Sequence, residues 1–456
     1  MTDVFADGSG PHVLMITNHG VHEWQVVPGL PDTGGQNVYV NQFTEALIDL
    51  GYRVTIVNRG GYPHPVTGRP QEGAVAHPSG RARILYIEDG TPEFVPKEDM
   101  DEHITALTGD LEGRLAGEAL RYDVIISHYW DGGKLGATIN DRAPDRVPHV
   151  WVPHSLGALK KRNVDPSTWP GLRIDERIAN EHDLIGRIDG AVSTSHAITE
   201  TFVNDYGHRP AYFLPPCVDV ARYRPRGDDE CAAIWSFLEH HSEHTAQELR
   251  TRRIVTEISR TDYTKRKDVL IRAFARIRDQ MPGVLLIVAL DERAGAPYEE
   301  AMAMIGSLEL SRDVIVLGSV WDQLPCLYAI TSVYCTPSVM EGFGMSAQEA
   351  AATAVPVVSS DLVPFVREYL LGPQPLQVSL DGTVGDRHLL VGSGATVVPA
   401  DDVEGFAEAL KMLLADPEAS SEMGRRAFDI TVPYFSWEAR TRDLLDDLGI
   451  GSTGSP

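Results

Sequence analysis

Short apolar runs rich in valine, isoleucine and leucine recur along the chain, and longer amphipathic stretches separate them. Apolar runs of this length are typical of strands buried on both faces of a parallel sheet, and the stretches between them are typical of covering helices. The alternation predicts an α/β protein with doubly wound sheets. The expected strands are residues 12–17, 53–58, 82–87, 123–128, 149–153, 191–195 and 211–214, then 254–258, 284–289, 314–317, 333–336, 355–359 and 396–398.

Apolar residues at helical spacing predict the helices between these strands. The chain is expected to end in helices, followed by a disordered tail over residues 451–456. The expected helices are residues 38–50, 98–120 and 174–187, and the helical region at the end is 406–448.

The regular pattern breaks once, near the middle of the chain. A pair of prolines at 215–216 precedes a charged segment rich in proline and glycine, and a new series of strands begins at residue 254. A chain of 456 residues is too long for one ordinary core. We therefore predict two Rossmann-like domains facing each other across a cleft, with ligands at the carboxyl ends of the strands. The predicted divisions are residues 1–220, residues 221–435, and a C-terminal helix and tail over 436–456.

The formal net charge is −25. This charge argues against nucleic acid and membrane partners, because both need clustered lysine and arginine. A solubilising acidic surface and a salt-rich cytoplasm would both account for it. The apolar runs are too short to span a bilayer, and the first residues lack the features of a signal peptide.

The four cysteines, Cys217, Cys231, Cys326 and Cys335, have no CxxC spacing. In a chain of this length they are expected to be buried, reduced thiols. Together with the expected lack of targeting segments, this predicts a cytoplasmic protein.

Two carboxylates, Glu341 and Glu349, flank a glycine pair that opens a predicted helix. Their spacing exceeds two helical turns, so one acid lies in the loop and the other lies in the helix. A loop acid at a helix N-terminus can meet a ligand that also feels the positive end of the helix dipole. The arrangement suits a sugar joined to a diphosphate, with one acid for the sugar hydroxyls and the other for ribose.

Gly34 and Gly35 lie between the first strand and the first helix, where backbone N–H groups can approach an anion. For an isolated glycine pair, a tight turn with Asn37 as helix cap is the commoner case. The pattern lacks the GxGxxG spacing and the acid of a dinucleotide site, so dinucleotide binding is disfavoured.

Arg260 and Lys265 follow the first strand of the second series and precede a helix. Positive side chains are unfavourable at a helix N-terminus unless an anion binds there, so the two cations suit a diphosphate. His154 also follows a strand, where structural and catalytic roles are about equally expected. His240 and His244 have a zinc-like spacing, but without a third ligand we expect a polar linker helix.

These motifs together resemble those of the retaining family-4 glycosyltransferases of the GT-B fold, and within them the sucrose-phosphate synthase and sucrose synthase branch. The resemblance covers nearly the whole chain. It rests on the sequences DTGGQ at 32–36, HYWDGG at 128–133, HSLG at 154–157, SRTDYTK at 259–265 and EGFGMSAQE at 341–349.

The resemblance implies a reaction without a metal or other cofactor, in which UDP-glucose is the expected donor. The leaving phosphate itself would take the acceptor proton, and pre-organised cations would stabilise the departing charge. The implied donor-binding residues are Gly34, Gly35, Arg260, Lys265, Glu341, Gly342, Phe343, Gly344 and Glu349. The implied catalytic residues are His154, near the reacting carbon, with Arg260, Lys265 and Glu341.

The resemblance further implies an acceptor site in the first domain for a small phosphorylated sugar such as fructose 6-phosphate. Cations in loops of an otherwise acidic chain are what such an acceptor needs. The implied acceptor-binding residues are Gln36, Lys97, Tyr129, Ser155, Lys160 and Arg177.

The chain departs from the family pattern at three places. Cys217 stands where family members usually carry glycine, residues 361–365 replace a Gly-Gly-Pro loop near the donor, and residues 371–394 are an insertion. The donor therefore stays open. The alternatives are a glycerate, inositol phosphate or natural-product acceptor, and a nucleotide-sugar-binding protein without turnover.

Overall fold

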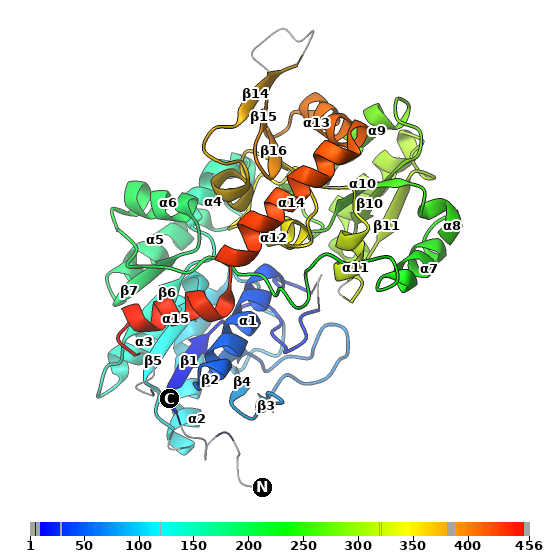
Figure 1. The fold of residues 1–456 in the computed structure, drawn as a ribbon. Coiled ribbons are helices and arrows are strands. Elements are labelled where there is room, and N and C mark those ends of the chain that lie inside the picture. The colour runs from blue at the N-terminus through cyan, green and yellow to red at the C-terminus, as the bar shows by residue number, and fades with distance from the viewer. Residues whose placement is uncertain are drawn as a thin grey trace. The chain divides into compact units, whose positions relative to one another are not determined.

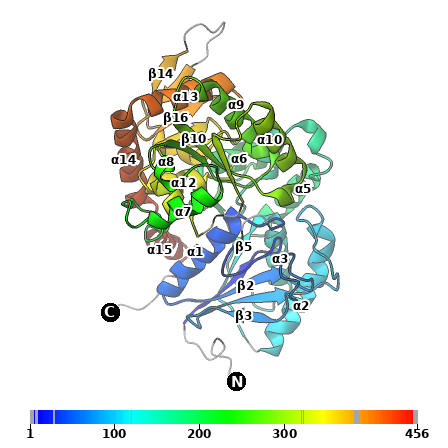
Figure 2. The ribbon, with the colours of Figure 1, turned by 90° about the vertical axis from the view of Figure 1, so that its right-hand side faces the viewer.

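Figures 1 and 2 show the protein as a computed structural model, which describes residues 5, 10–27, 30–118, 120–318, 320, 322–380 and 388–450. The chain divides into two compact units. Unit 1 comprises Met1–Pro216 and Trp437–Pro456, and unit 2 comprises Cys217–Ser436. The sequence places the boundary after residue 220 and sets residues 436–456 apart, whereas the structure groups the last helix with unit 1. The predicted disorder of 451–456 lies outside the described residues.

Unit 1 is built on an eight-stranded sheet of order β3-β4-β2-β1-β5-β6-β7-β8. Its described strand pairs are parallel, apart from β3 with β4. The strand order reverses at β1 and β5, which is the kind of position beside which ligands bind in this architecture. The strands are β1 (His12–Ile16), β2 (Arg53–Arg59), β3 (Ala74–Ala76), β4 (Ala82–Ile87), β5 (Val124–His128), β6 (His149–Val152), β7 (Gly190–Ser193) and β8 (Tyr212–Phe213).

Helices cover both faces of this sheet (Figure 2). Helices α2 and α3 contribute leucine and isoleucine side chains to a buried cluster with β1, β2, β4 and β5. Helix α1 packs instead against the C-terminal helix α15, where Trp437 contacts Tyr39 and Phe43. The helices of unit 1 are α1 (Gly35–Asp49), α2 (Ile104–Gly117), α3 (Tyr129–Arg142), α4 (Gly157–Asn163), α5 (Ile174–Ile185), α6 (His196–Tyr206) and α15 (Trp437–Asp447), with short 3-10 turns η1 (Met100–His103) and η2 (Pro166–Thr168).

Unit 2 is built on a second eight-stranded sheet, of order β11-β10-β9-β12-β13-β16-β15-β14. The sheet is parallel from β11 to β16 and ends in an antiparallel hairpin of β14 and β15. The strands are β9 (Arg253–Glu257), β10 (Val284–Ala289), β11 (Val314–Leu317), β12 (Val333–Thr336), β13 (Val357–Ser360), β14 (Leu376–Ser379), β15 (His388–Val391) and β16 (Ala395–Val398).

One apolar core fixes three helices of unit 2 on their sheet. Helices α9, α10 and α13 bury their apolar sides in a cluster with the central strands, which excludes water from the strand backbones. Helix α12 packs against α14. The helices are α7 (Ala232–His240), α8 (Ala246–Leu249), α9 (Lys267–Arg278), α10 (Ala296–Ser307), α11 (Leu324–Ala329), α12 (Met345–Ala352), α13 (Val403–Ala415) and α14 (Pro417–Tyr434), with the turns η3 (Tyr263–Lys265) and η4 (Glu292–Ala294) and the π-helical turn η5 (Val366–Leu370).

The predicted fold class is confirmed by these two parallel-dominated sheets. Every predicted strand exists, with ends shifted by up to two residues. Three strands escaped the sequence analysis: β3, which is exposed throughout, the mostly exposed β14, and the partly buried β15. β3 and β14 lie at the edges of their sheets, where exposed residues take the place of the longer apolar run that reveals a buried strand.

The cysteine prediction is wrong for one pair. The sulfur atoms of Cys231 and Cys326 are joined in a disulfide, whereas Cys217 and Cys335 are buried outside any disulfide, as expected. The two bonded residues are 95 positions apart, so no local spacing signals their pairing.

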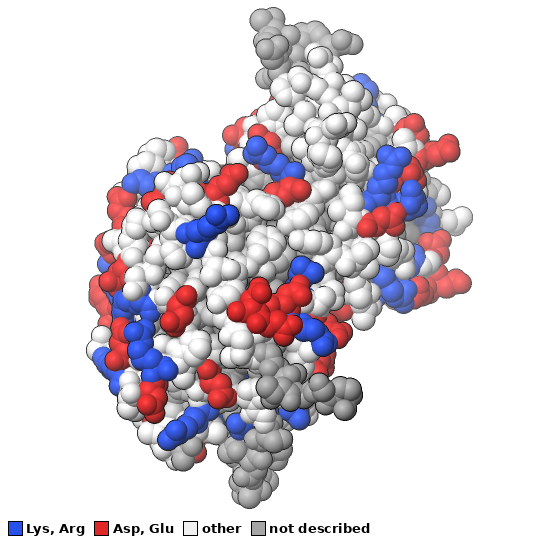
Figure 3. All heavy atoms as spheres, turned by 60° about the vertical axis from the view of Figure 1, so that its left-hand side comes forward, with Lys and Arg blue, Asp and Glu red and all other residues white. Residues whose placement is uncertain are grey.

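Within the described residues, no helix is long and apolar enough to cross a membrane. On the face drawn in Figure 3, lysine and arginine side chains lie singly or in small groups among acidic ones. The basic residues on this face therefore do not form the continuous stripe that nucleic acid binding uses.

Candidate active site

The predicted residues of unit 1 lie where strands β1, β5 and β6 end. These strands are neighbours in the sheet, so the loops that follow them emerge at the same edge. The loop after β1 leads into α1, the strand β5 runs directly into α3, and β6 is followed by His154 and α4.

The glycine pair begins helix α1, with Gly34 at its N-cap and Gly35 as the first helical residue. Asn37 is not the N-cap; its side-chain oxygen accepts a hydrogen bond from the backbone N–H of Gly34 at 2.9 Å. Gln36 donates to the hydroxyl of Thr17 at 2.9 Å. The loop is thus held by side chains of the helix that it opens, as an anion-binding helix N-terminus requires.

His154 adopts a left-handed backbone conformation (φ 56°), which is uncommon for a residue with a side chain. Its Nε2 lies 2.8 Å from Nδ1 of His128, and its ring meets the ring of Tyr39 edge-on. Burial, together with nearby His19, lowers the pKa of His154 to about 3. Burial also lowers the pKa of His128 well below its ordinary value, so the two rings share a hydrogen bond as neutral groups at neutral pH.

Two residues beside this pair were not singled out by the sequence analysis. His19 and Asp131 are both buried, and Nδ1 of His19 lies 3.0 Å from Oδ1 of Asp131. His19 follows β1, and Asp131 lies in the first turn of α3. Asp131 belongs to the motif at 128–133, and the position of both residues after neighbouring strands is the signal that could have found them.

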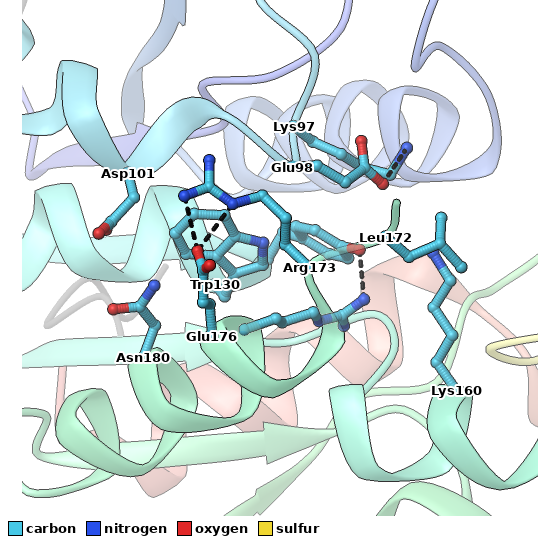
Figure 4. A pocket seen from close by; sticks show the side chains of 11 residues that line it. Lys97, Glu98, Asp101, Trp130, Lys160, Leu172, Arg173, Glu176 and Asn180 are labelled. Atoms are coloured by element: carbon cyan, nitrogen blue, oxygen red, sulfur yellow. Dashed lines mark hydrogen bonds and ion pairs between the residues drawn. The ribbon is translucent and has the colours of Figure 1, made fainter. Parts of the chain in front are cut away.

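A small hollow, partly open to solvent, lies at this edge of unit 1. It brings together four of the predicted acceptor-binding residues: Lys97, Tyr129, Lys160 and Arg177. Figure 4 labels Lys97 and Lys160 among the residues that line it. Gln36 is not among the residues that line it. The other lining residues are Glu98, Asp101, Trp130, Leu172, Arg173, Glu176 and Asn180.

Arg177, which lines the hollow, is held in place by several contacts. Its side chain is almost fully buried, pairs with Glu181 at 2.7 Å, and donates hydrogen bonds to the Tyr129 hydroxyl and to Ser155. Burial opposes the charge, but Tyr129 and Glu181 outweigh it and raise the pKa of Arg177. Glu181, which the sequence analysis did not identify, also accepts the backbone N–H of Gly157 at the start of α4. The arginine fork is therefore fixed before any ligand arrives.

Lys97 is tied to the glycine loop. Its Nζ and its backbone N–H both donate to the carboxylate of Asp32, the latter at 3.0 Å, and Nζ lies 3.4 Å from Glu98. Although burial works in the opposite direction, the charge of Lys97 lowers the pKa of Asp32. Asp32 itself has a left-handed backbone (φ 50°). The ion pair of Lys97 with Asp32 thus links the hollow to the loop that carries the glycine pair.

In unit 2, Lys265 and Glu341 are in direct contact. Nζ of Lys265 lies 2.5 Å from Oε1 of Glu341, and both side chains are largely buried. The backbone N–H of Val339 donates to the carbonyl of Thr264 at 2.8 Å, which joins the loop after β12 to the turn that carries Lys265. Glu341, the predicted sugar-binding acid, and Lys265, the predicted phosphate-binding cation, are therefore joined in one ion pair.

Arg260 extends from the same turn and is about half exposed. Its guanidinium lies 3.6 Å from Asp262. Burial would raise the pKa of Asp262, but Arg260 and Lys265 outweigh it and lower that pKa. The buried Lys267, 2.8 Å from Glu257, donates to the carbonyl of Ser259 at 3.0 Å and so fixes the end of β9 from which this turn departs.

In the motif at 341–349, the backbone conformation requires glycine at position 344. Gly344 caps helix α12 with φ 110°, and a Cβ there would meet a methyl carbon of Val363 at 2.6 Å. Phe343 is buried, and its carbonyl accepts the backbone N–H of Phe365 at 2.8 Å. The loop that replaces the Gly-Gly-Pro sequence therefore packs directly on the Gly342–Gly344 turn.

Glu349 lies inside α12 and accepts a hydrogen bond from the Tyr328 hydroxyl at 3.0 Å. Burial raises the pKa of Glu349 to about 7, although Tyr328, Tyr223 and Arg222 act to lower it. A carboxyl group with this pKa changes charge near neutral pH.

The histidines of α7 do not form a metal site. His240 and His241 contact backbone carbonyls of their own helix, and His244 contacts the carbonyl of Arg312 at 2.7 Å. The described residues contain no group of three or more histidine, cysteine or acidic side chains that could hold a metal ion.

Two family models match the chain along most of its length. The model of glycosyltransferase family 4 matches residues 33–222, and the model of glycosyl transferases group 1 matches residues 241–429. A mannosylfructose-phosphate synthase of Agrobacterium fabrum is 28% identical over 368 residues, which is 76% of each chain. A D-inositol 3-phosphate glycosyltransferase of Corynebacterium aurimucosum is 29% identical over 91% of each chain.

Solved structures share the fold. A sucrose-phosphate synthase from Thermosynechococcus elongatus superposes with a TM-score of 0.78 at 21% identity, over 97% of this chain and 100% of that one. The Anabaena protein HepE, solved with UDP-glucose, gives a TM-score of 0.67 at 16% identity, over 96% and 100% of the two chains. The matched models, the relatives and the two doubly wound units agree: the chain belongs to the family-4 glycosyltransferases of the GT-B fold.

Proposed function

We propose that the chain is a retaining hexosyltransferase that moves glucose from a nucleoside-diphosphate sugar, with UDP-glucose the expected donor, to a small phosphorylated sugar such as fructose 6-phosphate. The observation that supports a phosphorylated acceptor is the hollow of unit 1, which Lys97, Lys160 and Arg177 line together. A dianionic phosphate is the ligand that three cations on a polar, partly enclosed surface suit best.

The neighbouring carboxylates fit the rest of such an acceptor. Glu98, Asp101 and Glu176 line the same hollow as the cations. Carboxylates accept hydrogen bonds from sugar hydroxyls, whereas they repel a ligand made only of phosphate. A molecule with one phosphate and several hydroxyl groups satisfies both sets of side chains.

The donor would use the group in unit 2. Lys265 and Arg260 would stabilise the charge on the leaving diphosphate, Glu341 would accept hydrogen bonds from the hexose, and Glu349 would accept them from ribose. Arginine offers a planar fork and lysine a point charge, which together match the two phosphates. The leaving phosphate would take the proton of the acceptor hydroxyl, so no side-chain nucleophile is required.

His154 would contact the donor hexose as a neutral group. With its pKa lowered to about 3, it offers a hydrogen bond without a charge that would repel the positive carbon of the transition state.

The relatives favour a second acceptor. The D-inositol 3-phosphate glycosyltransferases match over nine-tenths of the chain, more than the 76% of the mannosylfructose-phosphate synthase. Inositol phosphate also combines one phosphate with several hydroxyls, so the hollow alone fits both.

The deciding experiment is a grid of donors and acceptors. UDP-, ADP- and GDP-glucose and UDP-N-acetylglucosamine are each incubated with fructose 6-phosphate, inositol 3-phosphate, fructose and glycerate, and nucleoside diphosphate release is measured. NMR of the product reports whether the anomeric configuration is retained. Release with fructose 6-phosphate but not with fructose supports the proposal, and equal rates with both contradict the phosphate-binding role of the hollow. Nucleotide binding without transfer to any acceptor contradicts the enzymatic proposal.

A further inference from the structure

The disulfide of unit 2 joins two segments that each carry a tyrosine close to Glu349. Cys231 is the N-cap of α7, and Tyr223 lies eight residues before it. Cys326 lies in α11, two residues before Tyr328. The bond therefore fixes the approach of the Tyr223 segment to the helix that carries Tyr328.

Both tyrosines face the carboxylate. Tyr328 is fully buried and donates to Oε2 of Glu349 at 3.0 Å. Tyr223 is also buried, its ring lies 5.9 Å from that of Tyr328, and Glu349 and Arg222 perturb its hydroxyl. The Tyr223 hydroxyl lies close enough to Glu349 and Arg222 for each of them to act on its pKa through a side-chain hydrogen bond.

The segment around Tyr223 is held by hydrogen bonds on one side and by the disulfide on the other. Asp219 accepts the backbone N–H groups of Ala221 and Arg222 through its side chain and that of Tyr223 through its carbonyl. After Tyr223, Arg224 pairs with Glu230 at 2.6 Å, but both side chains are exposed, and exposed ion pairs contribute little. The covalent bond at Cys231 adds a link to α11 that a reductant can break.

We propose that the Cys231–Cys326 bond is a redox-sensitive brace for nucleotide binding, and that Tyr223 and Tyr328 are the positioning residues through which it acts on Glu349. The inference rests on the proposed role of Glu349 at the ribose. A dithiol reductant opens the brace: the S–S bond breaks, each sulfur gains one electron and one proton, and the reductant becomes a disulfide.

Opening the bond removes the covalent link between Cys231 and Cys326 and lets the Tyr223 segment move away from α11. The hydrogen bonds that position Glu349 and lower its pKa are then weakened, while burial continues to raise that pKa. The charged groups and hydroxyls that face Glu349 are Arg222, Tyr223, Tyr328 and Tyr334. Nucleotide binding should become weaker, and its dependence on a charged Glu349 should shift to higher pH.

The test compares the affinity of UDP, ADP and GDP for the full chain after oxidation with oxidised glutathione and after reduction with dithiothreitol, between pH 6 and 8.5. Mass spectrometry reports the state of the cysteines. Reduction is expected to weaken binding by about three- to tenfold, which is the effect of one weakened hydrogen bond to a charged group. The pH of half-maximal binding is expected to rise, and re-oxidation is expected to restore both values.

Two variants separate this effect from a general loss of structure. Cys231→Ser with Cys326→Ser should bind like the reduced protein and should not respond to dithiothreitol. Tyr328→Phe should raise the pH of half-maximal binding in both redox states, whereas a purely structural role of the tyrosine would lower affinity equally at every pH. A reductant effect that persists in the double variant overturns the inference.

Equal affinities of the oxidised and reduced protein overturn the inference and leave the proposed function intact. Failure of the bond to form under oxidant also overturns the inference alone. If none of the three nucleotides binds in either state, the proposed function fails together with the inference.

Discussion

At the scale of single residues, the site is defined by charges that are held before any ligand binds. Arg177 is fixed by Glu181, Tyr129 and Ser155, and Lys265 is fixed by Glu341. A cation that is already positioned loses little side-chain entropy when a phosphate arrives. Such pairs are suited to stabilising a charge that develops during reaction, because they need little reorganisation.

Adjacent lysines of α4 provide a matched test of the acceptor hollow. Lys160 lines the hollow, whereas Lys161 pairs with Asp175 at 2.5 Å and lies against the Trp169 ring. Lys160→Ala is expected to raise KM for fructose 6-phosphate about tenfold or more, since a charge-assisted contact to phosphate is lost. Lys161→Ala, which removes the same charge one residue away, should leave KM within twofold. Steady-state kinetics of both variants decide the point, and equal effects would contradict the placement of the phosphate.

The carboxyl group of Glu349 gives a pH-dependent prediction with a definite sign. Its folded pKa of about 7 lies above the unfolded value of 4.5. The stability that Glu349 contributes to the folded state is therefore complete below pH 4.5 and is lost as pH rises through 7. The free energy of unfolding should fall by roughly 2 to 3 kcal/mol between pH 5 and pH 8 because of this group. Glu349→Gln should remove this loss, so without nucleotide the variant should gain stability relative to the wild type as pH rises.

Urea unfolding of unit 2 in the full chain at pH 5 and pH 8 measures that difference. The same variant should lose most of its affinity for UDP, because the carboxylate that accepts ribose hydroxyls is gone. A stability difference that is independent of pH would show that Glu349 is not the titrating group.

At the scale of elements, both half-sites lie on loops that follow parallel strands. The site of unit 1 follows β1, β5 and β6, and that of unit 2 follows β9 and β12, which are neighbours in their sheet. The helices that begin there, α1 and α12, each start at a glycine. At Gly344 the missing side chain allows the backbone to lie against Val363, where a Cβ would clash.

Gly344→Ala tests this use of glycine. With φ 110° and a Cβ 2.6 Å from Val363, the change is expected to destabilise unit 2 by about 1 to 3 kcal/mol and to displace the turn that carries Glu341. Gly306→Ala, inside α10 where a Cβ meets nothing within 4 Å, should instead be neutral or stabilising by up to about 1 kcal/mol. Thermal unfolding with and without UDP measures both. A loss of stability at Gly306 equal to that at Gly344 would contradict the explanation.

At the scale of the whole molecule, the two units divide the predicted chemistry. The acceptor hollow and His154 belong to unit 1, whereas Arg260, Lys265, Glu341 and Glu349 belong to unit 2. Each unit has its own sheet and its own buried clusters. Ligands for the two half-sites should therefore stabilise different parts of the chain.

Hydrogen exchange of the full chain can measure that division. UDP alone is expected to slow exchange mainly in the turn after β9 and at the start of α12. Fructose 6-phosphate alone is expected to slow exchange mainly in α4 and α5, which carry Lys160 and Arg177. A bound ligand stabilises the segments that it contacts, and the backbone amides of stabilised segments exchange their hydrogens more slowly. Protection by the sugar phosphate confined to unit 2 would contradict the acceptor site proposed for unit 1.

The sequence by itself determined the parallel α/β architecture, because buried parallel strands are continuous apolar runs that need no knowledge of their neighbours. It also provided the charged and glycine candidates for the site, because Lys265, Glu341 and the glycines lie in short motifs after predicted strands. It failed for β3 and β14, whose residues are mostly exposed, and for the partly buried β15, and it set apart the last helix, which the structure groups with unit 1.

Only the tertiary structure decided which of these residues meet. The contact of Lys97 with Asp32, the hydrogen bonds from Arg177 to Tyr129 and Ser155, and the bond between Cys231 and Cys326 join positions from different elements. The pKa of Glu349 was equally beyond the sequence, because burial and the surrounding tyrosines set it. Local sequence determines which groups a loop carries, whereas the distances and the dielectric surroundings that give those groups their chemistry arise only when the sheet brings distant strands together.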